Sequence, residues 1–98
     1  MPLFKQKKFK LEMGYSRREF ILLLEAQNKL SFQRDANVIK FDLASSNVVV
    51  TLGSEKVRNV ASIRVPQLSV SFDFSQVNES EQTQFMKTFL LKFQRGGG

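Results

Sequence analysis

Alternation of apolar and polar residues is the feature of this 98-residue chain that most restricts its fold. Between residues 30 and 74, apolar side chains recur at every second position over several short segments. This is the period of a β-strand that buries one face. Short polar clusters separate the segments, and connections of that length join antiparallel neighbours. The sequence therefore predicts a mostly antiparallel sheet with one apolar face.

The predicted strands are short, and the last one is irregular. Their apolar positions are Phe9, Leu11 and Met13; Leu30 and Phe32; Ile39, Phe41 and Leu43; and Val48, Val50 and Leu52. We expect turns at 34–37 and at 53–56, where polar and turn-forming residues gather. In residues 57–74 the alternation changes phase at Pro66, so this segment is either one strand with a bulge or two strands.

A capping box marks the start of the first predicted helix. Ser16 is followed three positions later by Glu19, and Tyr15 and Phe20 occupy the two positions of a hydrophobic staple. This pattern predicts a helix over residues 17–28.

A second helix is predicted near the C-terminal end of the chain. Asn78 and Glu81 provide its N-terminal cap, and Phe85, Phe89 and Phe93 recur every four residues as one apolar stripe.

Together these elements predict a two-layer α+β fold. The expected order is β-α-β-β-β-β(-β)-α, with a mostly antiparallel sheet of five to six strands and two helices packed on one face. We expect residues 1–98 to form a single domain, with 96–98 as a flexible C-terminal glycine tail.

The chain contains no histidine, cysteine or tryptophan. Most catalysis near neutral pH uses an imidazole or a thiolate, so we expect no enzyme activity, no cofactor and no metal site. Paired carboxylates remain open as a catalytic group if Asp42 and Asp73 lie on neighbouring strands, but both are interpreted as outward, solvated charges.

The net charge of +6 is concentrated at the N-terminal end, where residues 1–18 carry six basic residues against Glu12 alone. Such a segment either attracts an acidic partner or protects an edge strand from aggregation. In the first predicted helix, the run Phe20–Leu24 is too long for one apolar face, so either both sides are covered or part of Ile21 and Leu22 stays exposed. The candidate partner-binding residues are Lys5, Lys7, Lys8, Lys10, Arg17, Arg18, Ile21 and Leu22.

Two alternative functions follow from the ends of the chain. Residues 4–10 interleave two phenylalanines with lysines, which is compatible with weak, non-specific binding of nucleic acid, although the predicted open face of the sheet has no aromatic residue. The end of the chain, Arg95, Gly96, Gly97 and Gly98, is similar to the tail of ubiquitin-like and sulfur-carrier proteins, which are activated at a C-terminal glycine. The resemblance covers only these last residues. Those carriers reach the tail from a strand, whereas a helix is expected here.

The run 60–74, with 85–87 and the closing Phe93-Gln94-Arg95-Gly96-Gly97-Gly98, resembles a group of small uncharacterised bacterial proteins. The resemblance covers roughly the C-terminal half and implies a bacterial origin without implying an activity. No apolar run approaches the roughly 20 residues of a membrane span, and no secretory signal is evident, so we expect a cytoplasmic protein. The sequence thus favours a small non-enzymatic domain, a monomer or homodimer, whose partner is a protein.

Overall fold

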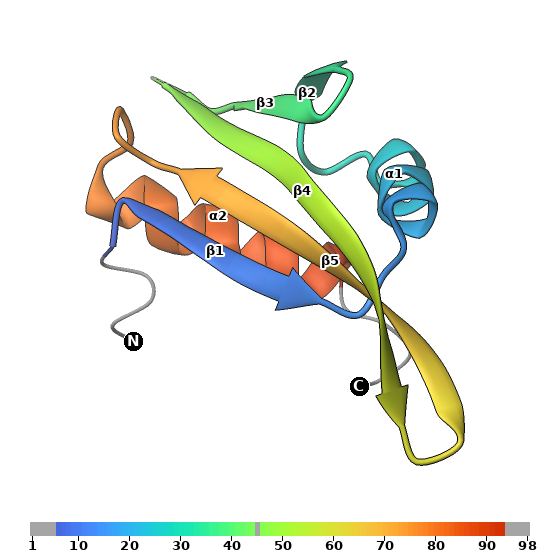
Figure 1. Ribbon diagram of the computed structural model, residues 1–98. Coiled ribbons are helices and arrows are strands. Elements are labelled where there is room, and N and C mark those ends of the chain that lie inside the picture. The colour runs from blue at the N-terminus through green and yellow to red at the C-terminus, as the bar shows by residue number, and fades with distance from the viewer. Residues whose placement is uncertain (1–5, 45, 94–98) are drawn as a thin grey trace.

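The computed structural model describes residues 6–44 and 46–93 and forms one five-stranded sheet with two helices (Figure 1). In chain order the elements are β1 (Lys8–Met13), α1 (Arg17–Ala26), β2 (Phe32–Asp35), β3 (Val38–Asp42), β4 (Asn47–Val60), β5 (Ile63–Asp73) and α2 (Glu79–Lys92). This order confirms the predicted β-α-β-β-β-β-α arrangement and its α+β class.

The sheet has the strand order β1-β5-β4-β3-β2, and every neighbouring pair is antiparallel. The first strand therefore joins the sheet beside the last one, while β2 to β5 follow one another as consecutive hairpins. Phe9 faces Phe72 across the β1–β5 ladder, and Val50 faces Phe72 across the β4–β5 ladder. Apolar residues from three strands thus form one continuous row on the buried face.

Helix α1 begins at the capping box that its sequence predicts. The Ser16 hydroxyl accepts a hydrogen bond from the Glu19 N–H, and the Glu19 carboxylate accepts one from the Ser16 N–H. The helix ends at Ala26, two residues before the expected end. The Gln27 side chain donates to the carbonyl oxygens of Leu24 and Leu30, which turns the chain towards β2.

Helix α2 supplies the centre of the hydrophobic core. Asn78 caps its first turn by accepting a hydrogen bond from the Glu81 N–H. Phe89 is fully buried, and its ring centroid lies 4.4 Å from that of Phe93 and 5.1 Å from that of Phe72. The four-residue repeat of phenylalanine is therefore the face that packs on the sheet.

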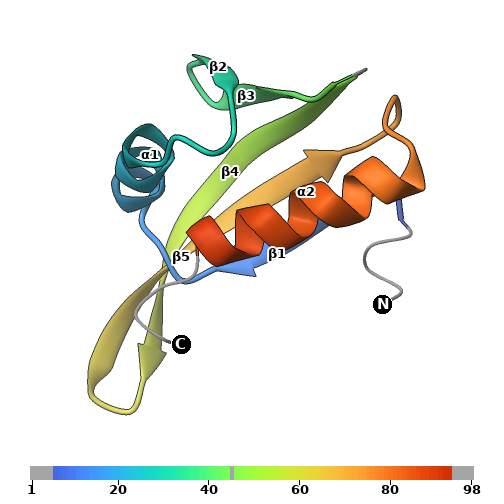
Figure 2. The same ribbon diagram turned by 180° about the vertical axis from the view of Figure 1, so that it is seen from behind.

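Both helices lie on the same side of the sheet, as the sequence predicts (Figure 2). The Phe20 ring of α1 stacks on Phe93, with centroids 4.8 Å apart, and meets Tyr15 edge-on at 6.4 Å. The Tyr15 hydroxyl donates a hydrogen bond to the carbonyl oxygen of Phe93. The start of α1 and the end of α2 are therefore joined by ring packing and by a buried polar contact.

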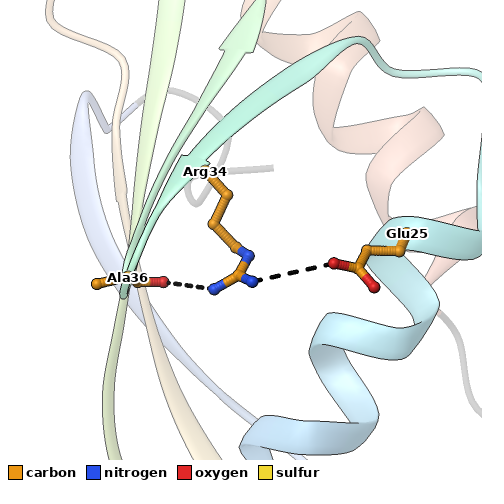
Figure 3. Close-up of polar contacts among 3 residues, drawn as sticks. All are labelled: Glu25, Arg34 and Ala36. Carbon is orange, nitrogen blue, oxygen red and sulfur yellow. Dashed lines mark hydrogen bonds and ion pairs between the residues drawn. The ribbon is translucent and has the colours of Figure 1, made fainter.

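A polar contact connects α1 to the outer hairpin of the sheet (Figure 3). The Arg34 guanidinium on β2 lies 3.9 Å from the Glu25 carboxylate on α1 and donates a second bond to the Ala36 carbonyl oxygen. Ala36 has a positive φ of 55° and begins the turn between β2 and β3. The expected turn at 34–37 is therefore confirmed, with its centre at Ala36 and Asn37.

The expected turn at 53–56 is wrong, because β4 continues through this segment to Val60. A β-bulge between Leu52 and Glu55 shifts the register against β5 without ending the strand. The chain turns instead at Ala61 and Ser62, so residues 57–74 belong to two strands. The change of phase within 63–68 does not interrupt β5. Its Ile63 end carries apolar residues on the opposite face.

Candidate functional site: a projecting hairpin arm

The hairpin of β4 and β5 extends well beyond the rest of the sheet. The neighbour β3 pairs with β4 only as far as Thr51, and β1 pairs with β5 only from Leu68 onwards. Residues 55–67, which we call the arm, are therefore a two-stranded ribbon. Figures 1 and 2 show the arm projecting past both helices.

The bulge at the base of the arm depends on Gly53. A β-carbon at this position would lie 3.2 Å from the Ser69 β-carbon and 3.4 Å from the Ser69 carbonyl oxygen. Such a distance is tighter than ordinary van der Waals contact, and Ser69 is itself buried. Glycine allows the two strands to approach where a bulge bends them.

The arm exposes apolar side chains that the sheet elsewhere buries. Ile63 is 63% exposed, Val57 is 55% exposed and Val60 is 49% exposed, whereas Val70 and Val50 in the body of the same strands are fully buried. Val60 faces Ile63 across the ladder, and Val65 faces Arg58. Because opposite residues share a face, Val60, Ile63 and Val65 form one apolar surface, continuous with the side of β5 that bears Ser71 and Asp73.

Charge on the arm is almost entirely positive. It carries Lys56, Arg58 and Arg64 against one acidic residue, Glu55. The Glu55 carboxylate lies at the base, where it accepts a 2.7 Å hydrogen bond from the backbone N–H of Arg17 in the first turn of α1. A carboxylate is favourably placed at a helix N-terminus. The outer arm thus combines exposed aliphatic groups with uncompensated cations.

The basic residues predicted at the N-terminal end are divided among different positions. Lys7 donates a hydrogen bond to the Val77 carbonyl oxygen, where it ties the chain to the loop before α2. Lys8 and Lys10 lie on the open face of the sheet, opposite Asp73 and Ser71 of β5. Lys5 lies outside the described residues. The described lysines therefore do not combine into one concentrated positive patch.

Asp73 is the acidic counterpart of Lys8 on the open face. The Ser75 hydroxyl and the Ser75 N–H both donate to its carboxylate, the latter at 2.9 Å. These hydrogen bonds, together with the charge of Lys8, lower the pKa of Asp73 from its ordinary value of 3.8. Two open hollows lie beside it. One of about 200 Å³ is shared with Lys40, Asn47 and Ser75, and a more open one of about 440 Å³ is shared with Lys8, Lys10 and Thr51. Ligand-binding pockets of about 300–1,000 Å³ bury most of their ligand, whereas both of these hollows are open.

The structure separates the two carboxylates that the sequence suggested as a pair. Asp42 on β3 faces Asn47, and Asp73 on β5 faces Val49, with β4 lying between the two strands. Throughout residues 6–44 and 46–93, no three histidine, cysteine, aspartate or glutamate side chains are grouped so that they could hold a metal ion. In the same part of the chain, neither helix has the length and apolar character needed to cross a membrane.

The candidate residues on α1 differ in exposure. Leu22 is 57% exposed, whereas Ile21 packs partly against the core. The Arg17 side chain donates a 2.5 Å hydrogen bond to the Asn37 side chain, so it connects α1 with the turn before β3. Arg18 is exposed. The apolar surface expected on α1 is therefore reduced to the single side chain of Leu22.

The tail residues Arg95, Gly96, Gly97 and Gly98 lie outside the described residues. The last described element is α2, which ends at Lys92 with Phe93 as its C-cap. The described chain thus approaches the tail through a helix, in contrast to the strand of ubiquitin-like carriers. The prediction of a C-terminally activated carrier stays untested.

Sequence reasoning missed the arm and its exposed residues Val57, Val60 and Ile63. Two signals pointed to it. Residues 57–74 make an 18-residue segment, which is longer than a usual strand of about 3–10 residues. Gly53 lies inside an otherwise apolar strand pattern, where an isolated glycine often marks a bulge. No known protein family, curated protein or solved structure matches this chain.

Proposed function

We propose that this chain is a non-enzymatic protein-binding domain that holds an acidic partner protein through the arm. The observation that carries the proposal is a projecting ribbon with exposed apolar and cationic side chains on both faces. Val60 and Ile63 lie on one face with Lys56 and Arg58, and Val57 lies on the other face with Arg64. Contiguous exposed apolar groups bordered by charge are typical of protein interaction surfaces.

The physical argument concerns what the arm gains from a partner. A two-stranded hairpin alone is only marginally stable in water. Here the arm is maintained because β4 and β5 continue into the buried sheet. Covering its aliphatic side chains would recover about 25 cal/mol for each Å² of apolar surface removed from water. An acidic partner would also offset the charges of Lys56, Arg58 and Arg64.

A protein fits this surface better than a nucleic acid does. The described part of the arm has no aromatic side chain on which a base can stack, and its three cations can neutralise only a few phosphates. On the open face of the sheet, Lys8 and Lys10 are interspersed with Asp73 and Glu12. The arm exposes the aliphatic side chains of Val57, Val60 and Ile63, which favours contact with a protein surface.

Site-specific photocrosslinking tests the proposal. A benzophenone amino acid is placed at Ile63 on the arm or, as a matched control, at Leu91 on α2, which is 73% exposed. We expect a discrete adduct with an acidic protein from position 63 and none from position 91. The captured protein is then purified, and its affinity for the unmodified chain is measured.

Charge reversal distinguishes the proposed surface from general attraction. We expect Arg58→Glu to weaken binding of the purified partner at least about tenfold, which corresponds to about 1.4 kcal/mol. Lys87→Glu, an exposed change on α2, serves as the control and should have little effect. Equal loss in both variants would contradict the proposal. Binding of random RNA or duplex DNA with a steep salt dependence, without a protein adduct, would replace it by nucleic-acid binding.

A further inference from the structure

The arm has two strand edges, and the sequence makes them unequal. Neither edge is paired by another strand among residues 6–44 and 46–93. An unpaired edge presents backbone N–H and C=O groups on which a further strand can form hydrogen bonds. The two edges differ in whether every residue whose backbone groups point away from the hairpin has an N–H group to donate.

Pro66 identifies which residues direct their backbone groups outward. In an antiparallel ladder, pairs that exchange hydrogen bonds alternate with pairs that do not. Pro66 faces Val57 and has no N–H, so this pair is of the kind that does not exchange bonds. By alternation, the Asn59–Arg64 pair is of the same kind. The outward backbone groups are therefore those of Val57 and Asn59 on β4, and of Arg64 and Pro66 on β5.

This alternation leaves the β4 edge intact and interrupts the β5 edge. Val57 and Asn59 each offer an outward N–H and an outward C=O, two positions apart, which is the spacing of an added strand. On β5, only Arg64 offers an outward donor, because Pro66 has none. A strand added to the arm therefore forms its complete ladder on β4.

We infer that an extended acidic segment of the partner adds as a further strand to the β4 edge at Val57–Asn59; the inference rests on the proposed function. Cross-strand neighbours share a face of the sheet, so residues flanking Lys56 and Arg58 on one face would be acidic. Residues beside Val57 on the other face would be apolar. The segment that fits best alternates acidic and apolar residues.

A second copy of this chain does not fit the same edge. Two β4 edges joined together would place Lys56 and Arg58 of one copy beside the same cations of the other. Like charges on neighbouring strands are destabilising, and the arm carries only Glu55 as a compensating group. Glu55 is already bonded to the N-terminus of α1. The charge therefore selects a different, acidic chain.

The inference is tested with a capped synthetic peptide of alternating glutamate and valine residues, added to the full chain. Backbone amide exchange is followed by NMR. We expect the amides of Val57 and Asn59 to exchange rapidly in the free protein and to become protected when the peptide is bound. The amides of Arg58 and Val60, which face β5, serve as internal controls and should be protected in both states.

Substitution at Val57 separates the backbone contribution from that of the side chain. Val57→Ala removes the side chain and keeps the N–H, whereas Val57→Pro removes both. The new proline lies opposite Pro66, at a pair that does not exchange hydrogen bonds, so the hairpin should keep the bonds between its two strands. Nuclear Overhauser contacts between Arg58 and Val65 serve as the check that the hairpin is intact. We expect Val57→Pro to bind the peptide about tenfold more weakly than Val57→Ala, the effect of one lost hydrogen bond.

The outcomes distinguish this inference from the proposed function. Equal affinity of the proline and alanine variants, or no new protection at Val57 and Asn59, would overturn strand addition. A peptide that fails to bind at millimolar concentration would overturn it as well. In each case the crosslink from position 63 and the effect of Arg58→Glu would still decide whether the arm is a protein-binding surface.

Discussion

The body of the sheet and the arm are built from the same two strands, yet their apolar residues have opposite surroundings. In the body, Val50 of β4 and Val70 of β5 are fully buried. In the arm, Val57 of β4 and Ile63 of β5 are more than half exposed. Residue type is similar in the two regions. Val57 lies on the face that is buried further along the sheet, and it is exposed because neither α1 nor α2 extends over the arm, whereas Ile63 lies on the opposite, open face.

This contrast shows that the helices determine how much of the sheet becomes core. Phe85, Phe89 and Phe93 of α2 occupy the space above the body, and Phe20 of α1 closes one end of it. Beyond the bulge, the exposed fractions of Val57, Val60 and Ile63 rise to between 49% and 63%.

The largest expected effect is on stability, and it is seen when one apolar side chain is truncated to alanine in the body or in the arm. Phe89→Ala removes a fully buried ring that contacts Phe20, Phe41, Phe72, Phe85 and Phe93. We expect the free energy of unfolding to fall by about 3–5 kcal/mol. Ile63→Ala on the arm should change it by less than about 0.5 kcal/mol. Urea denaturation of both variants measures the difference, and comparable losses would show that the arm is part of the core.

A smaller effect compares the turns of the two regions. Ala36 in the body and Ala61 at the tip of the arm both have φ of 55°, where glycine avoids a strain of about 1–2 kcal/mol. We expect Ala36→Gly to raise the free energy of unfolding by up to about 1 kcal/mol. Ala61→Gly should give a smaller gain, because the tip of the arm can open locally without the body, and should slow amide exchange at Arg58 and Val60. A gain equal to that of Ala36→Gly would show that the arm unfolds only together with the body.

The smallest effect concerns the open face of the body. Because the pKa of Asp73 in the folded state lies below its ordinary value of 3.8, its contribution to stability is complete above that value and is lost as the pH falls through the folded pKa. Ser75→Ala removes the hydroxyl donor and should raise the pKa of Asp73 towards 3.8. NMR titration of the carboxyl carbon measures this change. An unchanged pKa would assign the lowering to the backbone N–H of residue 75 and to Lys8 instead.

Local patterns in the sequence predicted most of the fold correctly. The capping box at Ser16, the cap at Asn78 and the phenylalanine repeat of α2 depend on neighbours within a few positions, and the structure confirms all three. Alternation likewise located β1, β2 and β3. These signals are readable because the interactions behind them are local or belong to a single face.

The arm was not predictable by the same reasoning, because its length depends on distant partners. Gly53 and Ser54 look like a turn, and only the approach of Ser69 shows that they form a bulge within β4. The chain does turn at Ala61 and Ser62, and Ala61, which has a positive φ there, is not a typical turn residue. The candidate lysines were identified by charge, but their separation depends on the sheet register. Of the predicted apolar pair on α1, only Leu22 is exposed.

The uninterrupted course of β4 and β5 has a mechanical consequence. Each strand runs without a break from the outer end of the arm into the buried sheet, so the arm is rigidly connected to the core. A molecule bound to the arm therefore contacts the same two strands that carry Val50 and Phe72 in the core. Binding of a ligand to the arm should therefore raise the melting temperature of the entire domain.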